Sequence, residues 1–368
     1  MTNSVRSGMG KRRICFIIGV LSNVGGTERM CTVIANSLRN DYDVTILSTW
    51  DVGAPSFKIE PEVAVDYLMR KWEGKIYKLA PWYFDLKLKR YLSERRFDIC
   101  VDVDICLAQH TIPAVRGLST KVVEWEQFSY EHTKSDPELL RCLALAKAEA
   151  DKIVVLTDQD LEAHISQAGI DDSLVTRIYN PSPLEGCRPS PLTQKNVLAI
   201  GRLAQQKGFD LLLRAWASVE EGLPGWNLLI VGSGEEGPSL ERLRDELHLK
   251  RVRFRSATTE VEACYDDASL YVMSSRYEGL ALVLLEALSK GLPIVSFDCP
   301  MGPREVVDDG ESGRLVPNGD VAALSVAIIE TLSSDGLRRK YSRGALAKSA
   351  VFAIAPIRDQ WISLFESL

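Results

Sequence analysis

The sequence has no long apolar segment, few histidines and no closely paired cysteines, and each absence excludes a class of protein. No apolar stretch reaches the roughly 20 residues of a membrane-spanning helix. The four histidines show no metal-ligand spacing. None of the eight cysteines forms a Cys-x-x-Cys pair, and several lie in apolar segments, which favours buried thiols in a reducing compartment. The sequence therefore predicts neither a membrane span nor a metal site.

The sequence also lacks an excess of basic residues, since its net charge is −6. General nucleic-acid binding needs a basic surface, so we expect no such partner. The basic triplet 11–13 and the apolar segment 14–21 superficially resemble a signal peptide. The apolar segment is short and lacks a convincing small-residue cleavage site after it, so we expect a first buried strand there.

Strand-like apolar segments alternate with helical patterns, which is typical of βαβ units and parallel sheets. Four prolines in residues 181–191 interrupt the alternation and predict a linker. A chain of 368 residues also exceeds one ordinary core. We expect an α/β protein with two Rossmann-like, doubly wound domains, 1–183 and 184–345, facing across a cleft, and a helical segment, 346–368. The expected strands are 14–20, 44–48, 99–103, 122–125, 153–156, 197–200, 228–231, 252–255, 270–273, 293–297 and 314–316.

Glu278 and Glu286 are the most informative pair of residues. Glu278-Gly279-Leu280-Ala281 is expected to open a helix, whose free N–H groups and dipole favour phosphate. Glu278 can accept hydrogen bonds from sugar hydroxyls, and Glu286 from the vicinal hydroxyls of a ribose. The alternative is an acidic helix N-terminus stabilised by the dipole. That alternative explains Glu278 but not a glutamate inside an apolar helix.

A basic loop, 201–208, follows an expected strand and contains Arg202 and Lys207. Arg offers a fixed fork of donors and Lys a mobile charge, so together they suit a diphosphate leaving group. The alternative is a solvated basic loop, but its occurrence with the two glutamates favours a function. A glycine turn at 25–29 is a weaker signal for backbone contact with phosphate or substrate.

Three further features leave alternatives open. The segment 232–237 matches the Gly-x-Gly-x-x-Gly dinucleotide pattern, but Glu235 and Glu236 would face a pyrophosphate, which disfavours NAD. Asp102-Val103-Asp104 imitates a metal motif far in sequence from the diphosphate residues. The basic, aromatic segment 70–96 predicts either a helix on an anionic membrane or a surface helix with its aromatics in the core.

Taken together, these stretches resemble the retaining glycosyltransferases of family 4, which have the GT-B architecture. The matching stretches are 25–29, 201–208, 228–234, 274–288, 291–300 and 302–305. The resemblance implies that the last helix crosses back onto the first domain, so that Trp361 is structural. It also implies roles for site residues: Arg202 and Lys207 for the donor diphosphate, Glu278 for the donor sugar, Glu286 for the ribose, and Gly26, Gly201, Gly279, Leu280 and Ala281 for contacts around the donor. Gln127 stands where relatives commonly have a histidine; it can hydrogen-bond a sugar hydroxyl but cannot titrate.

The resemblance implies a retaining transferase that needs no metal or other cofactor. We expect it to move a hexose or N-acetylhexosamine from a nucleotide diphosphate to a glycan acceptor carried on a lipid. The expected nucleotide is UDP. The product would be a bacterial envelope polysaccharide. The enzyme would be located in the cytoplasm or on the inner face of the plasma membrane. Two alternatives remain, a UDP-sugar epimerase on the same fold and an NAD-dependent oxidoreductase.

Overall fold

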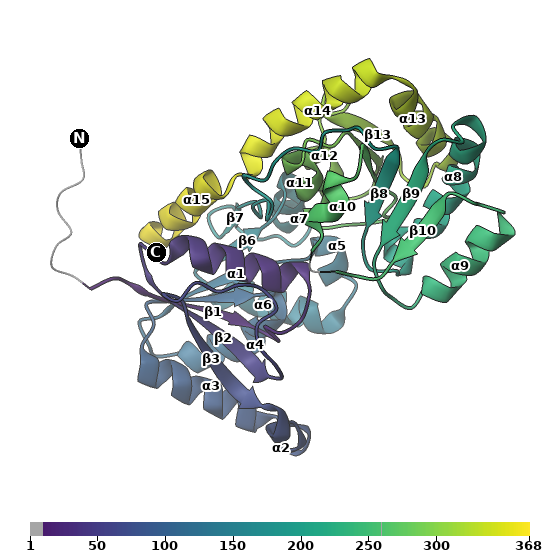
Figure 1. Cartoon of the computed structure of the whole chain (residues 1–368). Coiled ribbons are helices and arrows are strands. Elements are labelled where there is room, and N and C mark those ends of the chain that lie inside the picture. Colours follow the sequence, from purple (N-terminus) through teal and green to yellow (C-terminus); the bar gives the residue numbers. More distant parts are fainter. Residues whose placement is uncertain (1–9, 259) are drawn as a thin grey trace, which may run out of the picture. The chain divides into compact units, whose positions relative to one another are not determined.

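The computed structural model describes residues 10–258 and 260–368 and divides the chain into two α/β units (Figure 1). The first unit comprises the chain up to Leu156, with Leu161–Ile178 and Arg358–Leu368. The second comprises Thr157–Asp160 and Tyr179–Ile357. Each unit has its own parallel sheet, as the alternating sequence pattern predicts.

The first unit is built on a seven-stranded parallel sheet in the order β3-β2-β1-β4-β5-β6-β7. Its central strands are buried on both faces, which is why they read as continuous apolar segments in the sequence. Helix α1 lies on one side of this sheet and α3 on the other (Figure 1). The strands are β1 (Arg13–Ile18), β2 (Asp43–Asp51), β3 (Ala64–Arg70), β4 (Ile99–Val103), β5 (Lys121–Trp125), β6 (Lys152–Val155) and β7 (Val175–Arg177). The helices are α1 (Gly26–Leu38), η1 (Lys71–Glu73), α2 (Gly74–Leu79), α3 (Trp82–Arg95), η2 (Ile105–Leu107), α4 (Ala108–Val115), α5 (Tyr130–Thr133), α6 (Pro137–Glu149) and α7 (Asp158–Ser166).

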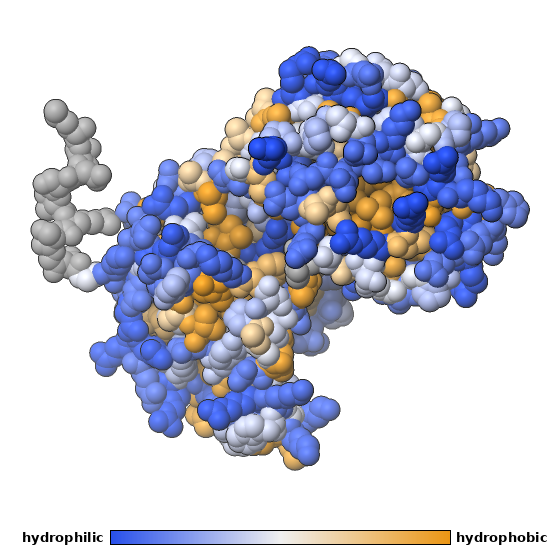
Figure 2. Space-filling view, in the orientation of Figure 1, coloured by the Kyte–Doolittle hydropathy of each residue, from blue (hydrophilic) through white to orange (hydrophobic). Residues whose placement is uncertain are grey.

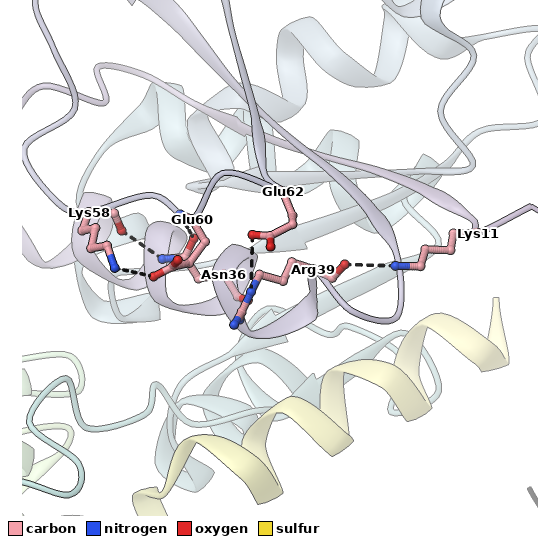
Figure 3. Close-up of polar contacts among 6 residues, drawn as sticks. All are labelled: Lys11, Asn36, Arg39, Lys58, Glu60 and Glu62. Carbon is pink, nitrogen blue, oxygen red and sulfur yellow. Dashed lines mark hydrogen bonds and ion pairs between the residues drawn. The ribbon is translucent and has the colours of Figure 1, made fainter.

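The loop between β2 and β3 is tied to the end of α1 (Figure 3). The side-chain amide of Asn36 donates to the carbonyl of Lys58 at 2.9 Å, and its oxygen accepts from the backbone N–H of Glu60 at 2.9 Å. Arg39 and Glu62 lie 3.8 Å apart. These contacts fix the path of a segment without helix or strand, so that β3 returns to the sheet edge.

Residues 70–96 form a broken segment rather than one helix. Pro81 follows the end of α2 and precedes Trp82, the first residue of α3, because a proline cannot supply the N–H that would continue α2. Some of its aromatic residues are structural: the Tyr77 ring lies 5.5 Å from that of Trp50, and Phe84 is buried. The expectation of a single helix is therefore wrong.

The last helix, α15 (Ile354–Ser367), begins in the second unit and contributes its residues from Arg358 onward to the first. Trp361 is fully buried there. Its ring lies 5.0 Å from Trp125 and 6.5 Å from Phe16, so strands β5 and β1 and the last helix share one aromatic core. Trp361 is structural, as the resemblance implies.

The second unit has a six-stranded parallel sheet in the order β10-β9-β8-β11-β12-β13. Residues 181–191 contain no helix or strand and are held to this unit, where Ser182 N–H donates to the Phe352 carbonyl at 2.8 Å. The strands are β8 (Asn196–Ile200), β9 (Asn227–Val231), β10 (Val252–Arg255), β11 (Leu270–Met273), β12 (Ile294–Asp298) and β13 (Gly313–Pro317). The helices are η3 (Gln205–Lys207), α8 (Phe209–Gly222), α9 (Gly237–Glu246), α10 (Glu262–Asp266), α11 (Leu282–Ser289), α12 (Pro303–Val306), α13 (Val321–Ser333), α14 (Asp335–Ser349) and η4 (Ala350–Phe352).

None of the helices within residues 10–258 and 260–368 has the length and hydropathy that a bilayer crossing requires.

Candidate functional site

Three loops meet at one edge of the second sheet, because they follow the adjacent strands β8, β11 and β12. The hydroxyl of Ser274 donates to the Lys207 carbonyl at 2.9 Å, and Arg276 N–H donates to the Gln206 carbonyl at 2.8 Å. The Arg276 guanidinium also donates to both carboxylate oxygens of Asp210, at 2.9 and 2.8 Å. These bonds fix the basic loop after β8 against the segment after β11.

Lys207 and Glu278 form an ion pair across these two loops. Nζ of Lys207 donates to Oε1 of Glu278 at 2.6 Å, and the two side chains are 19% and 7% exposed. The stem of Lys207 lies over Gly201, where a Cβ would come within 3.2 Å of its Cγ and Cδ. Gly201 thus leaves space for the lysine that reaches Glu278.

Arg202 lies beside this pair in the sequence but has a different environment. Its side chain is exposed and has no hydrogen-bond or ion-pair partner among the residues that the structure describes. The planar fork of donors is therefore available to a ligand, and its geometry suits the oxygens of a phosphate.

The segment from Glu278 to Ala281 precedes helix α11, which begins at Leu282 rather than at Glu278. Gly302 lies against it with φ +91°, and a Cβ there would lie 2.2 Å from the Gly279 carbonyl oxygen. The side chains of Leu280 and Ala281 are buried. Leu280 and Ala281 can therefore offer a ligand only their backbone groups.

Glu286 is buried in α11 and is held by a tyrosine that the sequence analysis missed. The hydroxyl of Tyr265 donates to Oε2 of Glu286 at 2.6 Å. The ring of Tyr271 stacks on Tyr265 at 5.9 Å. Burial raises the pKa of Tyr271 well above its usual range, and the charges of Glu286 and Glu278 raise it further. Tyr271 thus lies within electrostatic reach of both glutamates.

Cys299, just after β12, lies near the ion pair. Burial raises the pKa of its thiol to about 12, the charge of Glu278 adds to the rise, and the charge of Lys207 opposes it. The thiol is thus protonated at neutral pH. No sequence pattern distinguishes Cys299 from the other buried cysteines.

Two glycines of the segment 232–237 are explained by close packing of the backbone. A Cβ on Gly232 would lie 1.9 Å from the Gly201 carbonyl oxygen, and one on Gly234 would lie 2.4 Å from that of Leu203. Leu203 N–H also donates to the Ser233 carbonyl at 3.0 Å. Both glycines therefore allow the backbone of this segment to pack closely against the backbone of the basic loop 201–208.

The aspartates of the Asp-x-Asp segment also have partners within the protein. The hydroxyl of Thr111 donates to Oδ1 of Asp102 at 2.8 Å, and Oδ1 of Asp104 accepts from the N–H of Cys106 at 3.0 Å. Across the described ranges 10–258 and 260–368, no group of three His, Cys, Asp or Glu residues is arranged to hold a metal ion.

Gly26 and Gln127 belong to the first unit. Gly26 is the first residue of α1 and follows β1, and Gln127 follows β5 and is partly exposed. Both lie at the carboxyl edge of their sheet, whereas Gly201, Arg202 and the other predicted site residues lie in the second unit.

The family model for glycosyl transferases group 1 matches residues 194–334, which include all three loops of the site. An uncharacterized glycosyltransferase of Haemophilus influenzae is 32% identical over 357 residues, which cover 95% of this chain and 99% of the relative. The chain belongs to the group 1 glycosyltransferases.

Two other relatives of this glycosyltransferase have more specific names. The amylovoran biosynthesis glycosyltransferase AmsD of Erwinia amylovora is 27% identical, over 95% of this chain and 98% of the relative. A Campylobacter jejuni α-1,4-N-acetyl-D-galactosaminyltransferase, named for an acceptor linked to undecaprenol diphosphate, is 27% identical over 96% and 98%. The crystal structure of Anabaena HepE with UDP matches the glycosyltransferase with a TM-score of 0.80 and 22% identity, over 97% of this chain and 100% of HepE. The two parallel-sheet units are those of the GT-B fold.

Proposed function

We propose that this glycosyltransferase is a retaining, metal-independent enzyme of family 4. It takes a hexose or N-acetylhexosamine from a UDP-linked donor and transfers it to a glycan carried on a lipid, in the synthesis of an envelope polysaccharide. The names of the Erwinia and Campylobacter relatives support the glycan and lipid-linked acceptor, and the UDP bound by HepE supports the donor.

The observation that carries this proposal is the Lys207–Glu278 pair at 2.6 Å, formed by the same loop as Arg202, whose exposed guanidinium has no partner among the described residues. In the proposed complex, Arg202 and Lys207 neutralise the diphosphate, Glu278 accepts hydrogen bonds from sugar hydroxyls, and Glu286 accepts from the ribose. Backbone groups around Gly279 approach the donor. Gly26 and Gln127 contribute from the first unit, Gly26 near the phosphates and Gln127 at a sugar hydroxyl.

The proposed reaction is a front-face displacement. The acceptor oxygen bonds to the anomeric carbon as the bond from that carbon to the phosphate oxygen breaks. The departing phosphate oxygen takes the acceptor proton, so that UDP leaves on the face where the acceptor enters and the configuration is retained. The two cations stabilise the charge that grows on the diphosphate as the bond breaks.

Purified enzyme incubated with a panel of UDP-sugars tests the proposal. A UDP-dependent rise in melting temperature, transfer in the presence of EDTA and an NMR spectrum with the donor's anomeric configuration in the product would support it. Inversion of the anomer, or loss of transfer in EDTA, would contradict the retaining or the metal-independent part. An isomerised sugar nucleotide formed without acceptor would instead identify an epimerase, and stabilisation by NAD(H) but not by UDP would identify an oxidoreductase.

A further inference from the structure

The end of the first unit that follows β3 exposes large apolar side chains beside lysines. Trp72, Leu79, Trp82 and Leu86 are 64%, 88%, 65% and 56% exposed. Trp72 belongs to η1, Leu79 to α2, and Trp82 and Leu86 to α3. Helix α2 forms the tip of the first unit, at the lower edge of Figure 1. Figure 2 shows hydrophilic, intermediate and hydrophobic surface side by side at that end. We call these four residues the apolar tip.

Three lysines lie between or next to the residues of the apolar tip in the sequence. Lys71, Lys75 and Lys78 follow a helical spacing, are exposed, and form no ion pair within the described part of the chain. Of the nearby acids, Glu73 is paired with Lys87 at 2.9 Å, and Asp85 lies 2.6 Å from Nδ1 of His110 rather than beside one of these lysines. The surface around the apolar tip therefore carries uncompensated positive charge.

The other aromatics of the segment do not share this exposure. Tyr91 donates to Asp66 at 2.7 Å, and Tyr83 donates to Glu73 at 3.2 Å. Tyr91 thus ties α3 to β3, and Tyr83 ties α3 to η1, while the side chains of the apolar tip are exposed. Because the segment is fixed, exposing two tryptophans is a property of its fold rather than of a loose loop.

We propose that the apolar tip and its three lysines dock this glycosyltransferase on an anionic lipid bilayer. Tryptophan and leucine side chains enter the boundary between headgroups and acyl chains, and the lysines lie among the lipid phosphates. A second copy of the chain fits the surface less well, because a twofold contact would bring two sets of unpaired lysines together.

Docking here deepens the proposed function, on which it rests for the lipid-linked acceptor. The tip follows β3 at the carboxyl edge of the first sheet, the same edge at which β1 leads to Gly26. A bilayer at that edge would present lipid-linked glycans to the first unit. Vesicle binding needs neither donor nor acceptor, so the two proposals can fail separately.

Sedimentation with phosphatidylglycerol vesicles tests the docking surface. The wild-type protein is expected to bind, and Lys71→Gln/Lys75→Gln/Lys78→Gln to bind about 100-fold more weakly, at roughly fivefold per lysine near an anionic surface. The matched control is Lys58→Gln/Lys195→Gln/Lys250→Gln, which removes the same charge from exposed sites elsewhere and should keep wild-type binding. Equal loss in both triple variants would overturn the proposal, as would no binding by the wild-type protein.

Tryptophan fluorescence tests insertion. Trp125, Trp216, Trp361 and Trp226 are buried, and Trp50 is half-buried against Tyr77. A blue shift on adding vesicles, and quenching by brominated lipid, would therefore report the exposed Trp72 and Trp82. Trp72→Ser/Trp82→Ser should abolish both signals while leaving the melting temperature and UDP-sugar hydrolysis unchanged. An unchanged blue shift in that variant, or concentration-dependent dimerisation that the same variant abolishes, would overturn docking through the tip.

Discussion

The ammonium group of Lys207 donates a 2.6 Å hydrogen bond to Glu278, a residue 71 positions away in the sequence. In this arrangement each residue neutralises the other. A diphosphate would compete with Glu278 for the lysine, which links leaving-group binding to the carboxylate proposed to hold the sugar.

Removing either cation should cost turnover. We expect Arg202→Ala and Lys207→Ala each to lower kcat by about 100-fold or more, or ~3 kcal/mol, because charge on the leaving diphosphate is no longer stabilised. Arg202→Ala should leave the melting temperature unchanged, since the exposed guanidinium has no partner among the described residues. Lys195→Ala, at another exposed position of the same unit, is the control. Turnover within twofold of the wild type in Arg202→Ala would contradict its assigned role.

Glu278→Gln should separate nucleotide binding from sugar transfer. The amide keeps the shape of the side chain but releases Lys207 from its ion pair, so UDP should bind at least as tightly as it does to the wild type. Turnover should fall because the carboxylate that accepts from the sugar is lost. Calorimetry with UDP and a transfer assay measure the two effects. A large loss of UDP affinity would show instead that Glu278 is needed to position Lys207.

Tyr265→Phe tests whether the tyrosine positions Glu286. Its hydroxyl donates to the buried carboxylate at 2.6 Å, and a hydrogen bond to a charged group contributes about 1.5–3 kcal/mol. We expect KM for the sugar nucleotide to rise about tenfold or more with kcat little changed, because the ribose contact is made equally in the ground and transition states. Tyr341→Phe, a buried tyrosine in α14, should change neither constant. A fall in kcat at constant KM would argue against a ribose role for Glu286.

The first unit should lose stability as the pH rises, because of a buried acid pair. Asp102 on β4 and Glu124 on β5 are register partners and both are fully buried. Burial raises the pKa of both carboxyl groups, and the charge of Asp102 adds to the rise at Glu124. The folded protein therefore keeps protons that the unfolded chain releases above about pH 4, so this contribution to stability is present at low pH and lost as the pH rises through the folded pKa values.

Glu124→Gln should flatten this dependence. Its melting temperature should exceed that of the wild type by a margin that grows from pH 5 to pH 8, at about 2–4 °C for each kcal/mol relieved. Glu162→Gln, an exposed position in the same unit, is the control and should show no growing margin. A constant difference between Glu124→Gln and the wild type at all pH values would rule out the shared titration.

The central strands were predicted because they are buried on both faces, whereas the edge strands β10 and β13 were found although part of each is exposed. Val101 and Val295 are fully buried members of β4 and β12, and their apolar neighbours made these strands evident. Strand β3 was missed because it lies at the sheet edge and its first four positions, Asp66 among them, are exposed or half-buried, so that only Leu68 and Met69 are buried. Strand β7 is only three residues long, too short for a pattern.

The residue types of the candidate site were evident from the sequence, but their partners were not. The loop 201–208 and Glu278 could each be recognised as unusual for their positions. Their ion pair, and the bond from Tyr265 to Glu286, depend on which strands lie side by side, and the sheet order is not written in any local pattern. Tyr265 in particular lies in a five-residue helix without a motif around it.

Trp361 and Phe365 complete a core whose other walls, Phe16 and Trp125, come from the first third of the chain. During synthesis the ribosome therefore releases the second unit before the first can close. After the first sheet has been synthesised, about 200 further residues must be translated before the last helix is available, which takes about 10–40 s at 5–20 residues per second. During this time the aromatic face of the sheet is uncovered. Chaperone dependence in the cell should accordingly be concentrated in the half of the protein that is made first.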